Sequence, residues 1–417
     1  MSRTNTSKEL TGEEISGTKT GLVSELGTLL KSNIRQYAMY ITLVAIFIIF
    51  DILTNGIFLS SRNISNLILQ TGYVAVLAIG MTMILVIRHI DLSVGFIAGF
   101  TGAVSALLMK NWGINEWVAI LIVLCIGLAI GLYQGSLVAY VKVPAFVVTL
   151  AGMFIFRGML LLVTQKTGSI IVDRKINNGY YSIANGFIPD KILSVPFGLK
   201  VHIMTVIVGL VAICLVIFLQ MKARRNKRKY DFTVSSTPIF ISGLILISII
   251  IMAVVFLLST YNGLPWTAVI VGVVLFIFNF ILNKTALGRY IYGIGGNPEA
   301  SELSGVNVKQ VTMFVFASMS TLAALAGVMY TSRIGTAGPS AGVGFELDAI
   351  ASAFIGGCAV TGGVGKVTNT IIGALVIMSL TSGFLLMGVD VAYQYIAKGI
   401  IFIIAVAFDV VTRRKRA

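Results

Sequence analysis

The sequence predicts an all-α integral membrane protein, a polytopic helical bundle of about 12 transmembrane spans. Of its 417 residues, 57% are hydrophobic and 11% are charged, and the mean hydropathy is +0.95. Soluble domains carry about 25% charged residues, so this composition indicates a chain that lies in lipid. Apolar runs recur along the whole length, and no polar segment between them is long enough to form a soluble domain.

Most of these apolar runs are close to the roughly 20 residues that a helix needs to cross the hydrocarbon core. The run at 347–363 is short and rich in glycine, which predicts a broken or tilted span. Together the runs define a transmembrane domain over residues 37–411, between a flexible cytoplasmic tail at 1–36 and a cytoplasmic tail at 412–417. In chain order they are 38–58, 64–87, 92–109, 117–140, 144–164, 201–220, 237–259, 265–282, 310–331, 347–363, 368–388 and 391–411.

The formal net charge of +15 is concentrated beside apolar runs, which argues against a nucleic-acid partner. Basic residues cluster at 222–229, 284–309 and 413–416. The positive-inside rule places such clusters in the cytoplasm. Two apolar runs separate the first cluster from the second, and four separate the second from the third. Even numbers of spans put all three clusters, and both termini, on the cytoplasmic side.

This topology makes 222–236 a basic cytoplasmic loop and 165–200 the large external loop. Two glycine-rich polar breaks interrupt the apolar pattern, at 88–95 and 332–348. Irregular backbone at membrane depth is tolerated only where protein or water shields it. Paired interruptions of this kind can mark a binding region between structural halves.

The polar loop at 283–309 lies between two apolar runs and predicts a short helix at its centre. Pro298 suits a first helical turn, Glu299 lies near the positive end of the helix dipole, and Gly305 suits a helix end. Such a helix is too short to cross a membrane. At the cytoplasmic face it can dock on a soluble partner.

This loop resembles the EAA-type coupling loop of permeases in ABC importers, with Glu299-Ala300-Ser301 followed by Gly305. Ser301 departs from the strict pattern by a small-for-small change. The segments 288–292 and 295–297 are similar to the version found in permeases for monosaccharides. The resemblance covers nearly all of residues 60–411. It extends to the segments 61–67, 90–95, 142–146, 341–357 and 393–399, and the additional segment 222–264 is similar to that of xylose-type permeases.

The resemblance implies a type II-like ABC permease fold and an ATP-driven importer of a monosaccharide, xylose or a related pentose. It implies a homodimer in a bacterial plasma membrane, served by an extracytoplasmic sugar-binding protein and by a separate ABC ATPase. The chain is then expected to be no enzyme and to need no cofactor or metal, and its other partner is membrane lipid. The residues expected to contact the ATPase are Arg289, Asn297, Pro298, Glu299, Ala300, Leu303 and Gly305.

Asp91 and Ser93 fall in the first break, which the topology places near the cytoplasmic face. Position alone favours a solvated turn in which Asp91 caps the next helix. The resemblance of residues 90–95 to a segment typical of the family favours a structural or gating role. Three amides on span surfaces, Gln70, Asn279 and Gln394, are candidates for lining the sugar pathway, and interhelical hydrogen bonding is an equal alternative.

Arg157 lies inside an apolar run, toward its outer end. A cation there is expected to face protein or water, or to extend to the interface, and extension to the interface or an ion pair is favoured over direct substrate contact. Its possible partners are Asp51, Glu346 and Asp348, of which Glu346 and Asp348 are also candidates for the pathway. In another run Gly127, Gly131 and Gly135 repeat every four residues, which predicts close helix packing.

An ion-coupled secondary transporter of a small solute remains an alternative. Such a protein usually needs carboxylates buried in mid-membrane, whereas the acidic residues here lie at the ends of apolar runs. A membrane-embedded transferase would need an Asp-rich metal–diphosphate motif, which the sequence lacks. The segment 362–366 resembles a phosphate-binding loop but lacks its first glycine and its final hydroxyl residue, so no nucleotide site is expected.

Overall fold

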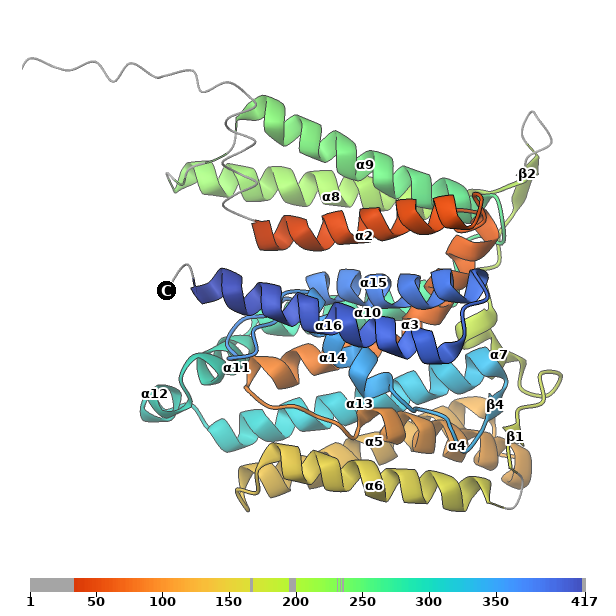
Figure 1. The fold of residues 1–417 in the computed structure, drawn as a ribbon, viewed down its shortest axis with the longest axis vertical. Helices are drawn as coiled ribbons and strands as arrows, with labels where there is room; N and C mark the ends of the chain where they lie inside the picture. Colours follow the sequence, from red (N-terminus) through yellow and green to blue (C-terminus); the bar gives the residue numbers. More distant parts are fainter. Residues whose placement is uncertain are drawn as a thin grey trace, which may run out of the picture.

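The structure, a computed structural model, describes residues 34–414 except 166–167, 195–199, 231, 233 and 235. Long helices run nearly side by side and form most of the molecule (Figure 1). The helices of the first half are α2 (Ile34–Leu53), α3 (Ser61–Val86), α4 (Val94–Trp112), α5 (Glu116–Ala139), α6 (Ala145–Thr164), α7 (Asn178–Asn185) and α8 (Ile203–Lys229). Those of the second half are α9 (Thr237–Ser259), α10 (Trp266–Lys284), α11 (Ala286–Gly296), α12 (Pro298–Leu303), α13 (Val308–Ile334), α14 (Phe345–Ile355), α15 (Val367–Leu386) and α16 (Val391–Arg414).

The described residues include nine helices that are long and apolar enough to cross a membrane. The described parts of α2 and α16 add two shorter apolar helices, Met39–Leu53 and Val391–Ile404. The polytopic helical fold is therefore as predicted. The run at 347–363 forms only the 11-residue helix α14 followed by irregular backbone, so it is a broken span. The predicted total of about 12 spans remains a prediction.

The two ends of the bundle differ in what they carry (Figure 1). At one end lie α11, α12, the basic end of α8 and the end of α16. At the other end lie α7 and the short strands β1 (Ile170–Ile171), β2 (Ile192–Ser194) and β4 (Thr336–Ala337). Two of the three basic clusters, 222–229 and 284–309, thus lie at the same end of the described structure, and the third, 413–416, lies partly outside the described residues.

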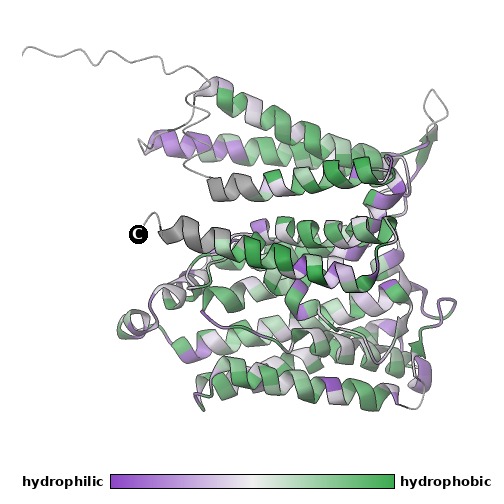
Figure 2. Cartoon of the chain, in the orientation of Figure 1, coloured by the Kyte–Doolittle hydropathy of each residue, from purple (hydrophilic) through white to green (hydrophobic). Residues whose placement is uncertain are grey.

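The hydropathy of the helices matches a membrane environment, because green apolar residues cover the middle of the bundle and polar residues gather at its ends (Figure 2). The most deeply buried of the long helices are α3, α4 and α13. Helix α13 packs against α3, α4 and α5, and α3 also packs against α14 and α15. Glycines bring these helices close. A side chain on Gly127, Gly131 or Gly135 of α5 would meet backbone or side-chain atoms of α13, as the spacing of these glycines predicts.

The outer loops are folded against the bundle by specific hydrogen bonds. Strand β1 pairs antiparallel with β4. The Glu116 carboxylate accepts a hydrogen bond from the Tyr180 backbone N–H (2.9 Å) near the start of α7. The Ser332 hydroxyl on α13 accepts another from the Ala184 N–H (3.1 Å) near its end. The large loop at 165–200 therefore contains a short helix fixed to α5 and α13, which hydropathy alone did not predict.

Replacing Gly131 by Val is expected to lower the stability of the bundle by about 1–3 kcal/mol, because its side chain would overpack the contact with α13. A Cβ atom at Gly131 would lie only 2.6 Å from the Ala317 Cα. Gly158→Val on α6 is the matched control, since a Cβ there meets no atom within 4 Å. Thermal unfolding in detergent measures both variants. Equal stability of the two would contradict the packing argument.

Candidate functional site

The predicted short helix in the 283–309 loop is present as α12, and the predicted local signals explain it. Asn297 is the residue before the helix, and its side-chain oxygen accepts a hydrogen bond from the Ala300 N–H (3.1 Å). Pro298 occupies the first turn, followed by Glu299. The chain leaves the helix through Gly305, whose φ of +83° favours glycine. The prediction of a short helix that ends near Gly305 is confirmed.

The surface of α12 is unusually apolar at its tip. Leu303 is 90% exposed, the most exposed large hydrophobic side chain among the described residues. Glu299 and Ala300 are also exposed, as is Arg289 on the preceding helix α11. Ser301 instead faces inward and is buried. A single exposed apolar residue is common on protein surfaces, so it is the position of Leu303 on a projecting helix that makes it a candidate for docking another protein.

The helix α11 attaches α12 to the rest of the bundle. The Arg88 guanidinium, directly after α3, donates hydrogen bonds to the Gly295 carbonyl (Nε, 2.7 Å) and to the Gly296 carbonyl. The Tyr292 hydroxyl donates to the Gly365 carbonyl (2.7 Å). Burial raises the pKa of the Tyr292 phenol to about 12, so the hydroxyl stays protonated and keeps donating. These hydrogen bonds could not be predicted from the sequence, because Arg88 and Gly295 are 207 residues apart along the chain.

Glycine makes the junction between α11 and α3 possible. A side chain on Gly295 would collide with the carbonyl of Val86, which is the last residue of α3, and with the backbone of Gly363. The Gly363 N–H donates to the same Val86 carbonyl (2.8 Å). The glycine-rich segment 362–366, which resembles a phosphate-binding loop in sequence, therefore forms a close backbone contact between three segments.

The break after α3 is exposed at Arg88 and Ile90 but buried at its end. Asp91 and Ser93 are both 0% exposed, so the expectation of a solvated turn at this position is wrong. The reason is that residues 87–93 continue as non-helical chain beside α5 and α6, before α4 begins at Val94. One Asp91 oxygen, Oδ1, accepts hydrogen bonds from the Ser93 N–H (2.9 Å) and the Ser93 hydroxyl (2.6 Å). Asp91 thus closes a turn just before the helix and does not occupy the capping position itself.

Two further polar side chains complete this buried cluster. The Gln134 amide on α5 donates to the Ser93 hydroxyl (3.0 Å), and the Thr149 hydroxyl on α6 donates to the Ile90 carbonyl (3.2 Å). Both are buried. Gly152 leaves room for the Gln134 amide, which a side chain there would strike. Gln134 was not among the predicted site residues, although a lone amide inside an apolar run is the signal that selected Gln70 and Gln394.

The second glycine-rich break lies against the first. A side chain on Gly95 would strike the Gly342 carbonyl and the Glu346 carboxylate, and one on Gly99 would strike the Ala341 carbonyl. Gly342 itself has φ +87°. Backbone from the segment before α14 thus touches the first turns of α4. The two interruptions that the sequence shows meet in the interior of the bundle.

The carboxylates of α14 lie in two different environments. Glu346 is 9% exposed, and its Oε2 accepts no hydrogen bond from the described residues, like Oδ2 of Asp91. Asp348 forms an ion pair with Lys398 on α16 (2.9 Å). The sequence-based argument against an ion-coupled transporter assumed that acidic residues lie only at span ends. Buried Asp91 and Glu346 remove that argument.

The remaining predicted pathway residues are not brought together. Gln394 is 6% exposed and donates to the Val389 carbonyl (3.0 Å), which is a local bond at the start of α16. The Asn279 side chain on α10 accepts from Asn283 one turn later (2.7 Å). Gln70 is half-buried on α3. These amides lie on three helices, and the hydrogen bonds of Gln394 and Asn279 stay within their own segments.

Arg157 is exposed on α6, with its guanidinium carbon 5.6 Å from the centre of the Phe96 ring. The structure shows no ion pair between Arg157 and its three expected partners, all of which are described. Asp348 pairs with Lys398. Asp51 accepts a hydrogen bond from the Leu59 N–H (3.1 Å). Its neighbour is an aromatic face rather than a carboxylate, and extension of the exposed side chain to the interface stays a prediction.

A polytopic bundle with a short projecting helix and two interrupted segments that meet inside it is the architecture of a membrane permease subunit. A family model for the permease component of branched-chain amino acid transport systems matches residues 63–406. The chain belongs to this permease family.

Similar proteins extend over nearly the whole chain. A xylose transport system permease protein of Haemophilus influenzae is 37% identical over 383 residues, which cover 92% of this chain and 98% of that protein. The xylose transport system permease protein of Escherichia coli K12 is 35% identical over 418 residues and 100% of both chains. The ribose import permease protein of the same bacterium is 32% identical over 378 residues, 90% of this chain and 93% of that protein. No solved structure gives a significant match.

Replacing Asp91 by Asn is expected to keep the turn, because an amide oxygen can accept the same two hydrogen bonds from Ser93. Asp91→Ala removes the acceptor from a buried site and should lower stability by about 1–3 kcal/mol. Thermal unfolding of both variants, together with solute uptake in cells, measures the difference. Uptake that fails equally in both variants would show that the charge of Asp91 is required and would contradict its assignment as a turn former.

Proposed function

We propose that the chain is the transmembrane permease subunit of an ATP-driven importer for a monosaccharide, xylose or a related pentose. The observation that carries this proposal is the match to xylose permeases over the full length of both chains. The ribose permease is less similar and covers a smaller share of this chain. The description of the family names branched-chain amino acids, but the full-length relatives favour a sugar.

The partners follow from this class of transporter. Sugar would arrive from an extracytoplasmic binding protein, and a separate ABC ATPase would hydrolyse ATP. The exposed Leu303 on α12 supports ATPase docking, since an apolar side chain on a projecting helix gains by burial against a partner. Two copies of the permease would enclose the pathway between them.

The orientation in the membrane is also part of the proposal. The basic end of α8, the α11–α12 region and the end of α16 lie at the same end of the bundle in Figure 1. The positive-inside rule assigns this end to the cytoplasm, with both termini. The end that carries α7 and β1 would then face the binding protein.

Coupling would run from α12 through α11 to the end of α3. Movement of α12 on ATPase closure would pull on Arg88 through the Gly295 and Gly296 carbonyls. Arg88 lies three residues before Asp91, so the same movement would reach the buried break and the first turn of α4. The energy comes from the different affinity of the ATPase for two states of the permease.

The pathway would follow the two interrupted segments. A neutral sugar offers hydroxyl groups and no charge, so small residues and backbone groups suit it. The segment 335–344 contributes glycines, and the Asp348–Lys398 pair lies on the next turns. Selectivity would come mainly from the binding protein. Gln70, Asn279 and Gln394 would then affect rate more than sugar preference.

The ion-coupled alternative is kept because Asp91 and Glu346 are buried carboxylates. Reconstitution in proteoliposomes separates the two functions. Xylose uptake should require the ATPase, the binding protein and ATP inside the vesicle. Uptake by the permease alone under a proton or sodium gradient would overturn the proposal. The same assay with ribose or a branched-chain amino acid tests the substrate class.

Replacing Leu303 by Asp is expected to reduce ATPase docking and transport at least about tenfold, because it puts a charge into an apolar contact. The fold should be unaffected, since Leu303 is 90% exposed. Ile176→Asp is the matched control, because Ile176 is 78% exposed at the other end of the bundle. Binding of purified ATPase to each variant measures the effect. Normal ATPase binding by Leu303→Asp would exclude α12 as the docking element.

A further inference from the structure

We propose that the basic end of α8, residues 222–229, is a binding surface for anionic phospholipid headgroups. This segment contains the basic residues Lys222, Arg224, Arg225, Lys227, Arg228 and Lys229 and no acidic residue. Between residues 203 and 298 the chain has one acidic residue, Asp231. The local charge is therefore almost entirely positive.

The length of α8 places this segment at headgroup depth. Residues 203–221 are predominantly apolar and would span about 28 Å as a helix, close to the thickness of a hydrocarbon core. The helix continues without a break to Lys229. These last eight residues extend it by about 12 Å, which carries them through the headgroup layer. Figure 2 shows the polar end of α8 beside its apolar remainder.

The helices α8 and α9 form a hairpin that is anchored to the bundle at its other end. Their buried residues are Thr205, Gly209, Leu258 and Ser259, all within the outer turns. The other side chains of both helices are exposed or partly buried, and among them Leu257 packs against the bundle at the same end. Lipid or another molecule must cover this apolar surface.

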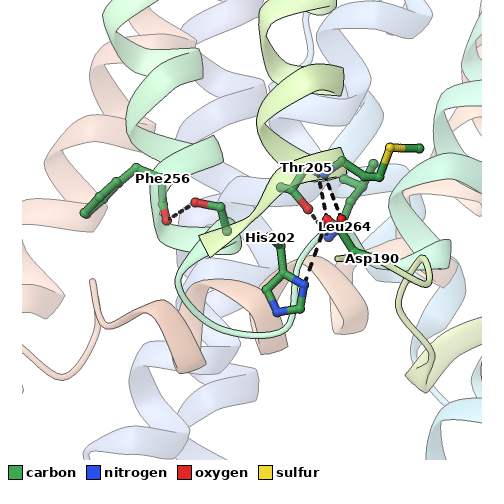
Figure 3. A network of polar contacts seen from close by, with 7 residues as sticks. Asp190, His202, Thr205, Phe256 and Leu264 are labelled. Carbon is green, nitrogen blue, oxygen red and sulfur yellow. Dashed lines mark hydrogen bonds and ion pairs between the residues drawn. The ribbon is translucent and has the colours of Figure 1, made fainter. Parts of the chain in front are cut away.

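The anchor is a network of polar contacts around Asp190 (Figure 3). Its carboxylate accepts hydrogen bonds from the Met204 N–H (2.9 Å) and the Thr205 N–H (3.3 Å) at the start of α8. The Thr205 hydroxyl accepts from the Leu264 N–H (2.9 Å) on the loop that leads to α10. The outer end of the hairpin is thus held firmly, whereas no buried residue holds the basic end to the bundle among those described.

At the basic end the hairpin is closed by Arg224, which donates to the Thr237 hydroxyl (3.1 Å) and lies over the Phe240 ring (4.3 Å to its centre). The other five basic side chains are exposed around the helix. Tyr230 and Phe232 follow with exposures of 68% and 66%. Exposed cations next to exposed aromatic rings suit a membrane interface, where rings insert at headgroup level and cations meet phosphates.

A soluble protein is the less suitable occupant. In Figure 1 the docking helix α12 and the basic end of α8 lie at the same end of the bundle but on opposite sides of it. The exposed apolar flank of the α8–α9 hairpin continues into the basic segment, so lipid that covers the flank brings its headgroups to these cations. Assignment to the inner leaflet rests on the proposed orientation, but lipid binding does not.

Native mass spectrometry of the purified full-length chain, titrated with phosphatidylglycerol or phosphatidylcholine of the same acyl chains, tests the proposal. The variant with Lys222→Gln, Arg225→Gln, Arg228→Gln and Lys229→Gln should lose at least about tenfold in affinity for phosphatidylglycerol. Its affinity for phosphatidylcholine should not change. Unchanged binding of phosphatidylglycerol by this variant would overturn the proposal.

The matched control removes the same number of charges at the other end, with Lys110→Gln, Lys175→Gln, Lys191→Gln and Lys200→Gln. It should bind phosphatidylglycerol like the natural chain, and an equal loss would trace the effect to net charge and refute a specific surface. A second variant, Arg225→Lys with Arg228→Lys, keeps the charge and should keep the binding. A loss in that variant, or a requirement for the four basic residues in ATPase binding without lipid, would assign the surface to another partner.

Discussion

The fold depends on one constraint, which is that backbone N–H and C=O groups at membrane depth must find partners inside the protein. Helices satisfy it along most of the chain. The exceptions are residues 87–93 and the segments on either side of α14. Each exception has exposed positions, such as Ile90 and Val343, but its inner part packs against other helices, where Gly95, Gly99 and Gly342 allow backbone to lie directly against backbone. Non-helical chain is tolerated at these inner positions because protein surrounds it.

The same constraint explains the polar side chains in the interior. Asp91, Ser93 and Gln134 form hydrogen bonds with one another and with the backbone that has left the helical pattern. Arg88 does the same for the carbonyls at the end of α11. The interruption after α3 therefore joins two regions. Arg88 near its start contacts the end of α11, and Gly95 just after it lies against the segment before α14.

Local signals were sufficient to predict the nine long apolar helices of the described structure, the two breaks and the helix α12. Apolar length identified those helices, and Asn297, Pro298 and Gly305 bracket α12 within nine residues. The depth of the break could not be predicted, because hydropathy reports composition and gives no position along the membrane normal. The position of Asp91 between two apolar runs therefore favoured a solvated turn, whereas the family resemblance favoured a structural or gating role.

The sequence also could not predict which side chains that are distant along the chain become partners. Arg88 and Gly295 are 207 residues apart, and Asp348 and Lys398 are 50 residues apart. The possible partners of Arg157 were chosen because they are predicted to lie on the same side of the membrane, and this criterion alone does not determine which side chains pair. Only tertiary packing selects among them. Gln134 could have been predicted, because it is a lone amide inside an apolar run, which is the pattern that selected Gln394.

If α12 couples the permease to an ATPase as proposed, the two hydrogen bonds of Arg88 limit the free energy that α12 can transmit to the end of α3. A change from 1% to 99% of one state requires about 5.5 kcal/mol of differential binding. Hydrogen bonds to a charged group contribute about 1.5–3 kcal/mol each, and the exposure of Arg88 favours the lower value. Its two bonds would then carry about 3 kcal/mol, which is less than a full switch needs. The close contacts of Gly295 and Gly363 with the Val86 carbonyl must supply the rest. These contacts are rigid because backbone cannot rotate away as a side chain can, so α11, the end of α3 and the 362–365 segment have to move together.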